Sequence, residues 1–140
     1  MPELRNVIVF TIGAVRYAVE LRWVREVVSL GFVTVVPTAP PAIGGVCNLH
    51  GTILPVLDVG AVLGGASGPP PRQGDGALVL ETEGLVCALR VDQVDHVASL
   101  QETAGSVIDA GGRTLPLLDP ARLVRGALEQ VGGGETGTPA

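Results

Sequence analysis

The segment Gly45–Asp58 reads Gly-Val-Cys-Asn-Leu-His-Gly-Thr-Ile-Leu-Pro-Val-Leu-Asp, and the rest of the chain can be understood around it. Two short apolar runs, Val46–Leu49 and Ile53–Leu57, meet at a polar break that ends in Gly51. A glycine in such a break lets the chain reverse direction while both runs stay buried. The segment is therefore predicted to form a tight β-hairpin.

The chain contains two internal matches that occur in the same order. The pattern Gly-x-x-Leu-Pro-x-Leu-Asp occurs at Gly51–Asp58 and again at Gly112–Asp119. Val7–Leu30 aligns without a gap on Ala77–Leu100, with the same hydrophobic pattern. The identical positions in this longer match include Val9/Val79, Ala18/Ala88, Val24/Val94, Val27/Val97, Ser29/Ser99 and Leu30/Leu100. A duplicated unit of this size predicts two similar small β-barrels that share apolar surface within one domain.

The composition favours an all-β fold. Apolar residues make up 46% of the 140 residues and aromatic residues only 3%, so the core must consist of Val, Leu, Ile and Ala. This mixture favours strands. The net charge is −5, and the nine basic residues, all Arg, are scattered along the chain, which argues against nucleic-acid binding.

Residues 27–57 contain no Asp, Glu, Lys or Arg, which raises the question of a membrane segment. Prolines and glycines interrupt this region, so it lacks the ~20 continuous apolar residues that a spanning helix needs. Direct membrane insertion is not expected. Cys47 and Cys87 occupy interior positions of predicted strands, as is typical of buried cysteines in a reducing cytosol. A cytoplasmic location is predicted.

Local signals place most of the remaining elements. Asp58 and Asp119 each follow a predicted strand and can cap a short helix, the second with Pro120 in its first turn. A short turn before Val24 is expected to lead into a strand, although Leu21, Val24, Val27 and Val28 also show helical spacing. The other predicted elements are hairpins at Asn6–Ile12/Arg16–Val19 and Ala77–Glu81/Leu85–Val91, strands at Val94–Leu100 and Thr114–Leu118, helices at Val59–Leu63 and Ala121–Leu128, and a loop at Gly64–Gly76.

With these motifs placed, the sequence resembles the CheW family of chemotaxis coupling proteins. The residues that carry the resemblance are Tyr17-Ala-Val, Val24-Arg-Glu-Val27, the Gly45–Asp58 run and Val91–Val97. It covers about Asn6–Leu128. The resemblance implies two packed SH3-like five-stranded β-barrels with short helices, one of them C-terminal, and no catalysis. A single domain at 6–128 and a disordered Gly-rich tail at 129–140 are predicted, and no cofactor is predicted.

The resemblance also implies two partners. The protein would be an adaptor between the cytoplasmic tip of a methyl-accepting chemoreceptor and the regulatory domain of a CheA-type histidine kinase. The receptor's helical hairpin would lie along the groove between the barrels, at the positions of Val24, Gly45, Val94 and Val97. An amphipathic helix fits a small aliphatic groove. For each valine alone, plain core packing is an equally good interpretation.

Two departures from the family pattern leave room for another adaptor role. His50 stands where the family usually has Arg, and that Arg pairs with the residue that corresponds to Glu26. A histidine pairs strongly with a carboxylate only while protonated, so the substitution makes the Glu26–His50 link either pH-dependent or merely a hydrogen bond. The region Gln101–Gly112 is also shorter than in many family members. The alternative function is therefore a CheW-like adaptor for a non-chemotactic partner.

An enzyme or metal site is the remaining class of function. Cys47, His50, Cys87 and His96 invite a zinc hypothesis, but residues three apart in a strand and turn point to different faces. The same geometry argues against a Cys47–His50 nucleophile, which also lacks an orienting carboxylate. No catalytic residues and no metal ligands are predicted.

Overall fold

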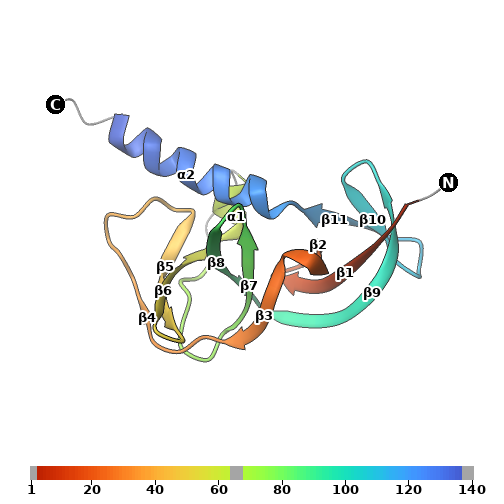
Figure 1. Cartoon of the computed structure of the whole chain (residues 1–140), viewed down its shortest axis with the longest axis horizontal. Coiled ribbons are helices and arrows are strands. Elements are labelled where there is room, and N and C mark those ends of the chain that lie inside the picture. The colour runs from red at the N-terminus through yellow and green to blue at the C-terminus, as the bar shows by residue number, and fades with distance from the viewer. Residues whose placement is uncertain (1–2, 64–67, 137–140) are drawn as a thin grey trace.

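Two β-sheets and two α-helices make up this computed structural model, which describes residues 3–63 and 68–136 (Figure 1). The strands are β1 (Glu3–Ile12), β2 (Val15–Glu20), β3 (Val24–Ser29), β4 (Val33–Thr34), β5 (Ile43–Leu49), β6 (Thr52–Leu57), β7 (Gly76–Thr82), β8 (Leu85–Val91), β9 (Gln93–Thr103), β10 (Ser106–Ile108) and β11 (Thr114–Leu118). A 3-10 turn, η1 (Leu21–Trp23), precedes β3, and the helices are α1 (Val59–Val62) and α2 (Pro120–Thr136). The all-β prediction is confirmed.

The two sheets are built on the same plan but differ in one strand. The first is a closed barrel with the strand order β1-β2-β11-β10-β9, and the second is a six-stranded sheet with the order β3-β7-β8-β6-β5-β4. In the closed barrel, β9 pairs with β1 along most of its length and with β10 through Gln101–Thr103. In the second sheet this role is divided between β3, which pairs with β7, and β4, which pairs with β5. One five-stranded barrel is therefore present as predicted, and its counterpart has six strands because residues 30–32 interrupt the equivalent of β9.

The sequence repeats do not coincide with the sheets. The first hairpin, β1–β2, pairs with β9 and β11 from the second repeat, whereas the second hairpin, β7–β8, pairs with β3 and β6 from the first. The junctions β2–β11 and β6–β8 are parallel, and the other pairings are antiparallel. Figure 1 shows β9 leaving β8 and crossing to lie along β1. Each sheet is thus built from strands of both repeats.

Three of the hairpin turns share one backbone conformation. His50–Gly51, Glu83–Gly84 and Ala104–Gly105 have positive φ at both residues, with values of 51° and 84°, 52° and 77°, and 49° and 82°. Two-residue turns of this kind match the right-handed twist of the strands that they join. The hairpin predicted at Gly45–Asp58 is confirmed, and Asn48 Oδ1 accepts a hydrogen bond from the Gly51 amide at 3.0 Å.

Three apolar clusters of described residues hold the domain together. One lies inside the closed barrel and one inside the six-stranded sheet, while the largest, here called the central core, draws on both sheets and both helices. Side chains alternate on β1, so that Val7 and Val9 face the barrel interior, and Ile8 and Phe10 face the central core. The alternation on β7 is the same. Its residues Ala77 and Val79 line the inner cluster of the six-stranded sheet, and Leu78 and Leu80 belong to the central core.

Both predicted helix caps are present. Asp58 Oδ1 accepts a hydrogen bond from the Ala61 amide at 3.1 Å, and Asp119 Oδ1 accepts one from the Ala121 amide at 3.0 Å. The prediction that α2 ends at Leu128 was wrong, because the helix continues to Thr136. After nucleation each further residue adds a hydrogen bond, and the glycines at 132–134, at about 1 kcal/mol each relative to alanine, do not stop the helix.

Two predicted segments fall partly outside the described residues, namely 137–140 of the tail and 64–67 of the Gly64–Gly76 loop. No helix in the described ranges is long and apolar enough to cross a membrane.

Candidate partner-binding face

Strand β3 carries a bulge beside the central core. Val24 pairs with Leu80 and Glu26 pairs with Val79, so Arg25 is an extra residue with no partner in the β3–β7 register. One extra residue shifts the alternation of side chains along a strand. As a result Val24 and Val27, three residues apart, lie on the same face of the sheet.

Strand β9 carries the same bulge at the equivalent position. Val94 pairs with Phe10 and His96 pairs with Val9, which leaves Asp95 as the extra residue. Asp95 is the residue that aligns with Arg25 in the internal repeat. The consequence is also the same, because Val94 and Val97 share a face.

The two valine pairs flank the central core. Val24 and Val94 are half-buried and pack against it, opposite Leu80 and Phe10. Val27 and Val97 lie opposite Leu78 and Ile8, two further residues of this core, but their own side chains are 51% and 58% exposed. We call Val24, Val27, Val94 and Val97 the valine face. It offers two anchored and two exposed small apolar side chains, one of each kind from each sheet.

Gly45 is not part of the valine face. It is buried in β5, and a Cβ atom there would lie 2.9 Å from the Thr34 carbonyl oxygen and 2.9 Å from Val33 Cγ1. The close approach of β4 is therefore a sufficient reason for glycine at this position. Val27 belongs to the valine face but was not among the contact residues predicted from the sequence, although its identity with Val97 in the repeat alignment was a usable signal.

The Glu26–His50 contact links β3 to the β5–β6 turn. His50 Nε2 lies 3.0 Å from Glu26 Oε1, and both side chains are exposed to solvent. The two residues stand at the rim of a hollow of about 250 Å³, whose apolar wall is formed by Leu49, Leu54, Val79 and Val86. Between exposed groups such a pair contributes about 0–1 kcal/mol, and its ionic component exists only while the imidazole is protonated.

The cysteines and histidines considered as metal ligands are spread over the domain. Cys47 lies in the inner cluster of the six-stranded sheet and Cys87 in the central core. Burial raises the pKa of both thiols, that of Cys87 to about 11, so both are protonated at neutral pH. His50 and His96 are exposed on different elements. Within residues 3–63 and 68–136, no three His, Cys, Asp or Glu side chains are grouped as a metal site.

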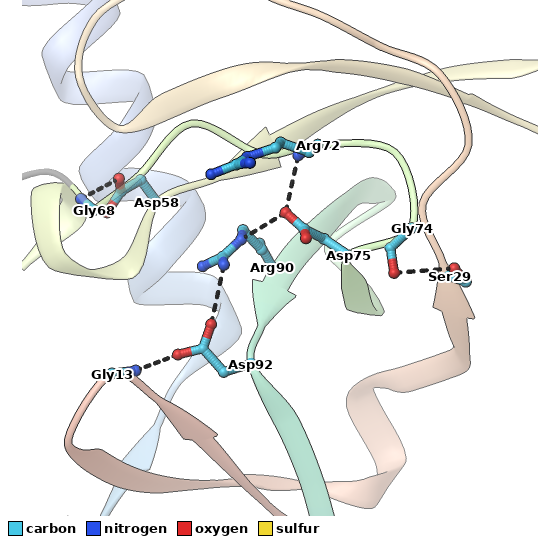
Figure 2. A network of polar contacts seen from close by, with 9 residues as sticks. All are labelled: Gly13, Ser29, Asp58, Gly68, Arg72, Gly74, Asp75, Arg90 and Asp92. Atoms are coloured by element: carbon cyan, nitrogen blue, oxygen red, sulfur yellow. Dashed lines mark hydrogen bonds and ion pairs between the residues drawn. The ribbon is translucent and has the colours of Figure 1, made fainter.

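A polar network connects the two sheets (Figure 2). Arg90 at the end of β8 donates to Asp75 at 2.9 Å and pairs with Asp92 at 3.0 Å. Asp92 in turn accepts a hydrogen bond from the amide of Gly13, in the β1–β2 turn of the closed barrel. Arg90 and Asp92 also line a pocket of about 290 Å³, whose other walls are mostly apolar. The network thus links the end of the β7–β8 hairpin to the turn of the β1–β2 hairpin.

The Asp75 carboxyl group responds to two opposing influences. Burial, the largest single influence, raises its pKa, whereas hydrogen bonds from the Arg72 amide and the Arg90 side chain, with the charges of both arginines, lower it. Together the lowering influences prevail, and the pKa lies below its usual value.

Comparisons with known proteins agree with this architecture. The family model described as "CheW-like domain" matches residues 6–128. The "Chemotaxis protein CheW" of Rhizobium meliloti is 31% identical over 98 residues, which cover 70% of this chain and 63% of that protein. The "Probable chemotaxis protein CheW" of Rhizobium etli shows the same identity and coverage. The match therefore spans less than two thirds of either relative.

Among solved structures, the scaffolding protein TtCheW from Thermoanaerobacter tengcongensis superposes with a TM-score of 0.67. That superposition covers 85% of this chain and 90% of TtCheW at 24% sequence identity, which shows a shared fold. The family model matches nearly the whole described chain. The protein belongs to the CheW-like domain family.

Proposed function

We propose that this protein is a non-enzymatic cytoplasmic adaptor, which couples the cytoplasmic tip of a methyl-accepting chemoreceptor to the regulatory domain of a CheA-type histidine kinase. The pathway would be chemotaxis or a related form of motility signalling. Membership of the CheW-like domain family and the chemotaxis proteins among its relatives support this proposal. The observation that carries it is the valine face, where Val27 and Val97 remain exposed beside a core that both sheets share.

The valine face suits the tip of a receptor, which is a helical hairpin. An amphipathic helix binds through apolar side chains spaced along one side, and these need a complementary apolar surface. Val27 and Val97 come from different sheets and from equivalent positions, so a helical hairpin could contact both halves of the domain at once. The four members of this face are all uncharged, which reduces the desolvation penalty of docking.

A bridging protein needs a second surface for the kinase. The outer side of β4, β5 and β6 carries two large exposed apolar side chains, Phe32 at 77% and Ile53 at 62% exposure. Phe32 directly precedes β4, and Ile53 pairs with Asn48 of β5. We interpret these two large exposed apolar side chains as part of a protein-binding surface. We assign the kinase regulatory domain to this outer side, which leaves the valine face free for the receptor.

The test is isothermal calorimetry against a receptor-tip fragment and, separately, against the kinase regulatory domain of the same organism. Val97→Glu should abolish binding of the tip and preserve binding of the kinase domain. Phe32→Ser with Ile53→Ser should have the opposite effect. Val15→Glu is the matched control, because Val15 is an exposed valine on β2 and belongs to neither surface. If the unmodified protein binds neither partner, the chemotactic assignment fails and the non-chemotactic adaptor becomes the better explanation.

A further inference from the structure

We propose that Asp95 is a positioning residue for the valine face, because it pins the bulge that turns Val97 toward the outside of the domain. This inference rests on the proposed function for its biological meaning, but its structural content can be tested without any partner. Asp95 itself would not touch the receptor. It would act by fixing the register of β9 against β1.

The carboxylate of Asp95 is held from both strands of the first hairpin. Thr11 on β1 donates its hydroxyl hydrogen to Asp95 Oδ2 at 2.9 Å, and Arg16 Nε on β2 lies 3.3 Å from the same oxygen. Only 12% of the Asp95 side chain is exposed. Hydrogen bonds to an ionised acceptor are stronger than neutral ones, and partial burial protects them from screening. The extra residue of the bulge is therefore fixed in place.

The bulge residue of the first repeat also pairs with the neighbouring hairpin, through a single and more exposed contact. Arg25, the bulge residue of β3, pairs with Glu81 on β7 at 3.4 Å. In the repeat alignment Glu81 corresponds to Thr11, just as Asp95 corresponds to Arg25. Each bulge residue thus contacts the equivalent position of the neighbouring hairpin. The bulge residue is positively charged in the first repeat and negatively charged in the second. Two different side-chain pairs at one geometric position indicate that the bulge itself is what both halves require.

The requirement follows from strand geometry. Residues three apart in a regular strand point to opposite faces, so without the extra residue Val94 and Val97 could not both lie beside the central core. A shift of β9 by one residue would turn Val97 into the barrel interior and expose a neighbour in its place. Thr11 and Arg16 hold Asp95 against that shift.

The experiment compares Asp95→Ala, Asp95→Asn and Thr11→Val with the unmodified protein. Methyl and amide NMR spectra report whether Val97 remains opposite Ile8, and calorimetry reports binding of the receptor tip and of the kinase regulatory domain. We expect Asp95→Ala and Thr11→Val to remove the Val97–Ile8 contacts and to weaken tip binding about tenfold, equivalent to about 1.4 kcal/mol. Binding of the kinase domain should not change.

Asp95→Asn is the conservative variant, because its amide oxygen still accepts the Thr11 hydrogen bond although the ion pair with Arg16 is lost, and it should retain the Val97–Ile8 register with a smaller loss of tip affinity than Asp95→Ala. Thr103→Val is the matched threonine control, since Thr103 is an exposed residue at the far end of β9, where it pairs with Ser106 of β10. Retained Val97–Ile8 contacts in a folded Asp95→Ala variant would overturn the inference. If the unmodified protein does not bind the tip, the proposed function fails, while the NMR register still decides the role of Asp95.

Discussion

Glu20 and Arg90 occupy equivalent positions in the two repeats but carry opposite charges, and each pairs with the residue two places further along the chain. Glu20 Oε2 lies 2.6 Å from Arg22 Nε, and Arg90 Nη2 lies 3.0 Å from Asp92 Oδ1. After the second strand of each hairpin there is therefore an ion pair between residues two apart, and the order of its two charges is reversed between the repeats. The Arg90 arrangement extends further, to Asp75 and, through Asp92, to the turn of the other hairpin.

Replacement of Arg90 should destabilise the domain more than replacement of the arginine in the equivalent pair of the first repeat. Arg90→Ala removes the cation from the half-buried carboxylate of Asp75 and from the exposed carboxylate of Asp92, and it should lower the free energy of unfolding by about 1–3 kcal/mol. Arg22→Ala is the matched control, because Arg22 is exposed and its pair should contribute about 0–1 kcal/mol. Urea unfolding at pH 7 measures both values, and equal losses would contradict a linking role for Arg90.

Acid should weaken the same network through Asp75. Its folded-state pKa is lowered from the ordinary value of 3.8, since the Arg72 and Arg90 contacts outweigh the opposing effect of burial. A lowered pKa gives stability that is fully present above the unfolded-state value and is lost as the pH falls through the folded-state value. Asp75→Asn should therefore be less stable than the unmodified protein at pH 7, and the difference should shrink toward pH 3. If the difference in free energy of unfolding between the unmodified protein and Asp75→Asn is the same at pH 7 and pH 3, this contribution of Asp75 is excluded.

Local chemistry explains why much of the fold could be predicted from the sequence. The turn at Gly51 and the caps at Asp58 and Asp119 depend on residues within a few positions of one another. The exchange of strands between repeats could not be predicted in this way. The segments Val7–Leu30 and Ala77–Leu100 have nearly the same hydrophobic pattern, so the pattern alone does not say which of them pairs with a given strand.

The valine face was partly visible in the sequence, but its signal was ambiguous. Val24 and Val27 are three residues apart, a spacing that also fits a helix. In the structure Arg25 forms a bulge in the strand. Because of this extra residue, the side chains of Val24 and Val27 lie on one face although they are three residues apart. Gly45 differs from the valines. The family resemblance assigned it to partner contact, but in the structure the close approach of β4 is a steric reason for glycine at this position.

Gly45→Ala tests that steric reason. The new Cβ would meet the Thr34 carbonyl and Val33, and a two-residue strand such as β4 has few hydrogen bonds to resist displacement. We expect a loss of about 1–3 kcal/mol in the free energy of unfolding and faster amide exchange in β4. Gly31→Ala is the control from the same region, since a Cβ there would meet no atom within 4 Å. Weaker receptor binding at unchanged stability would instead place Gly45 in a partner interface.

His50→Arg should strengthen the contact with Glu26 at neutral pH. An arginine is charged at every pH of interest, whereas the His50 contact gains an ionic component only on protonation, so it should become more favourable as the pH falls from 8 to 5. The expected gain for the arginine variant is below about 1 kcal/mol, because both side chains are exposed. Unfolding curves across this pH range provide the measurement. If the free energy of unfolding depends on pH in the same way in the unmodified protein and in the His50→Arg variant, the pair contributes nothing.

Substitutions within the valine face separate partner contact from core packing. Val97→Met enlarges a mostly exposed side chain, so it should leave the free energy of unfolding within about 0.5 kcal/mol of the original and weaken binding of the receptor tip. Val24→Met enlarges a side chain that packs against the central core and should destabilise the domain by about 1–3 kcal/mol as well. Val27→Met should behave like Val97→Met, because the two positions are equivalent and similarly exposed. Calorimetry and urea unfolding of all three variants give the comparison, and stable Val27 and Val97 variants with unchanged tip affinity would mean that the receptor docks elsewhere.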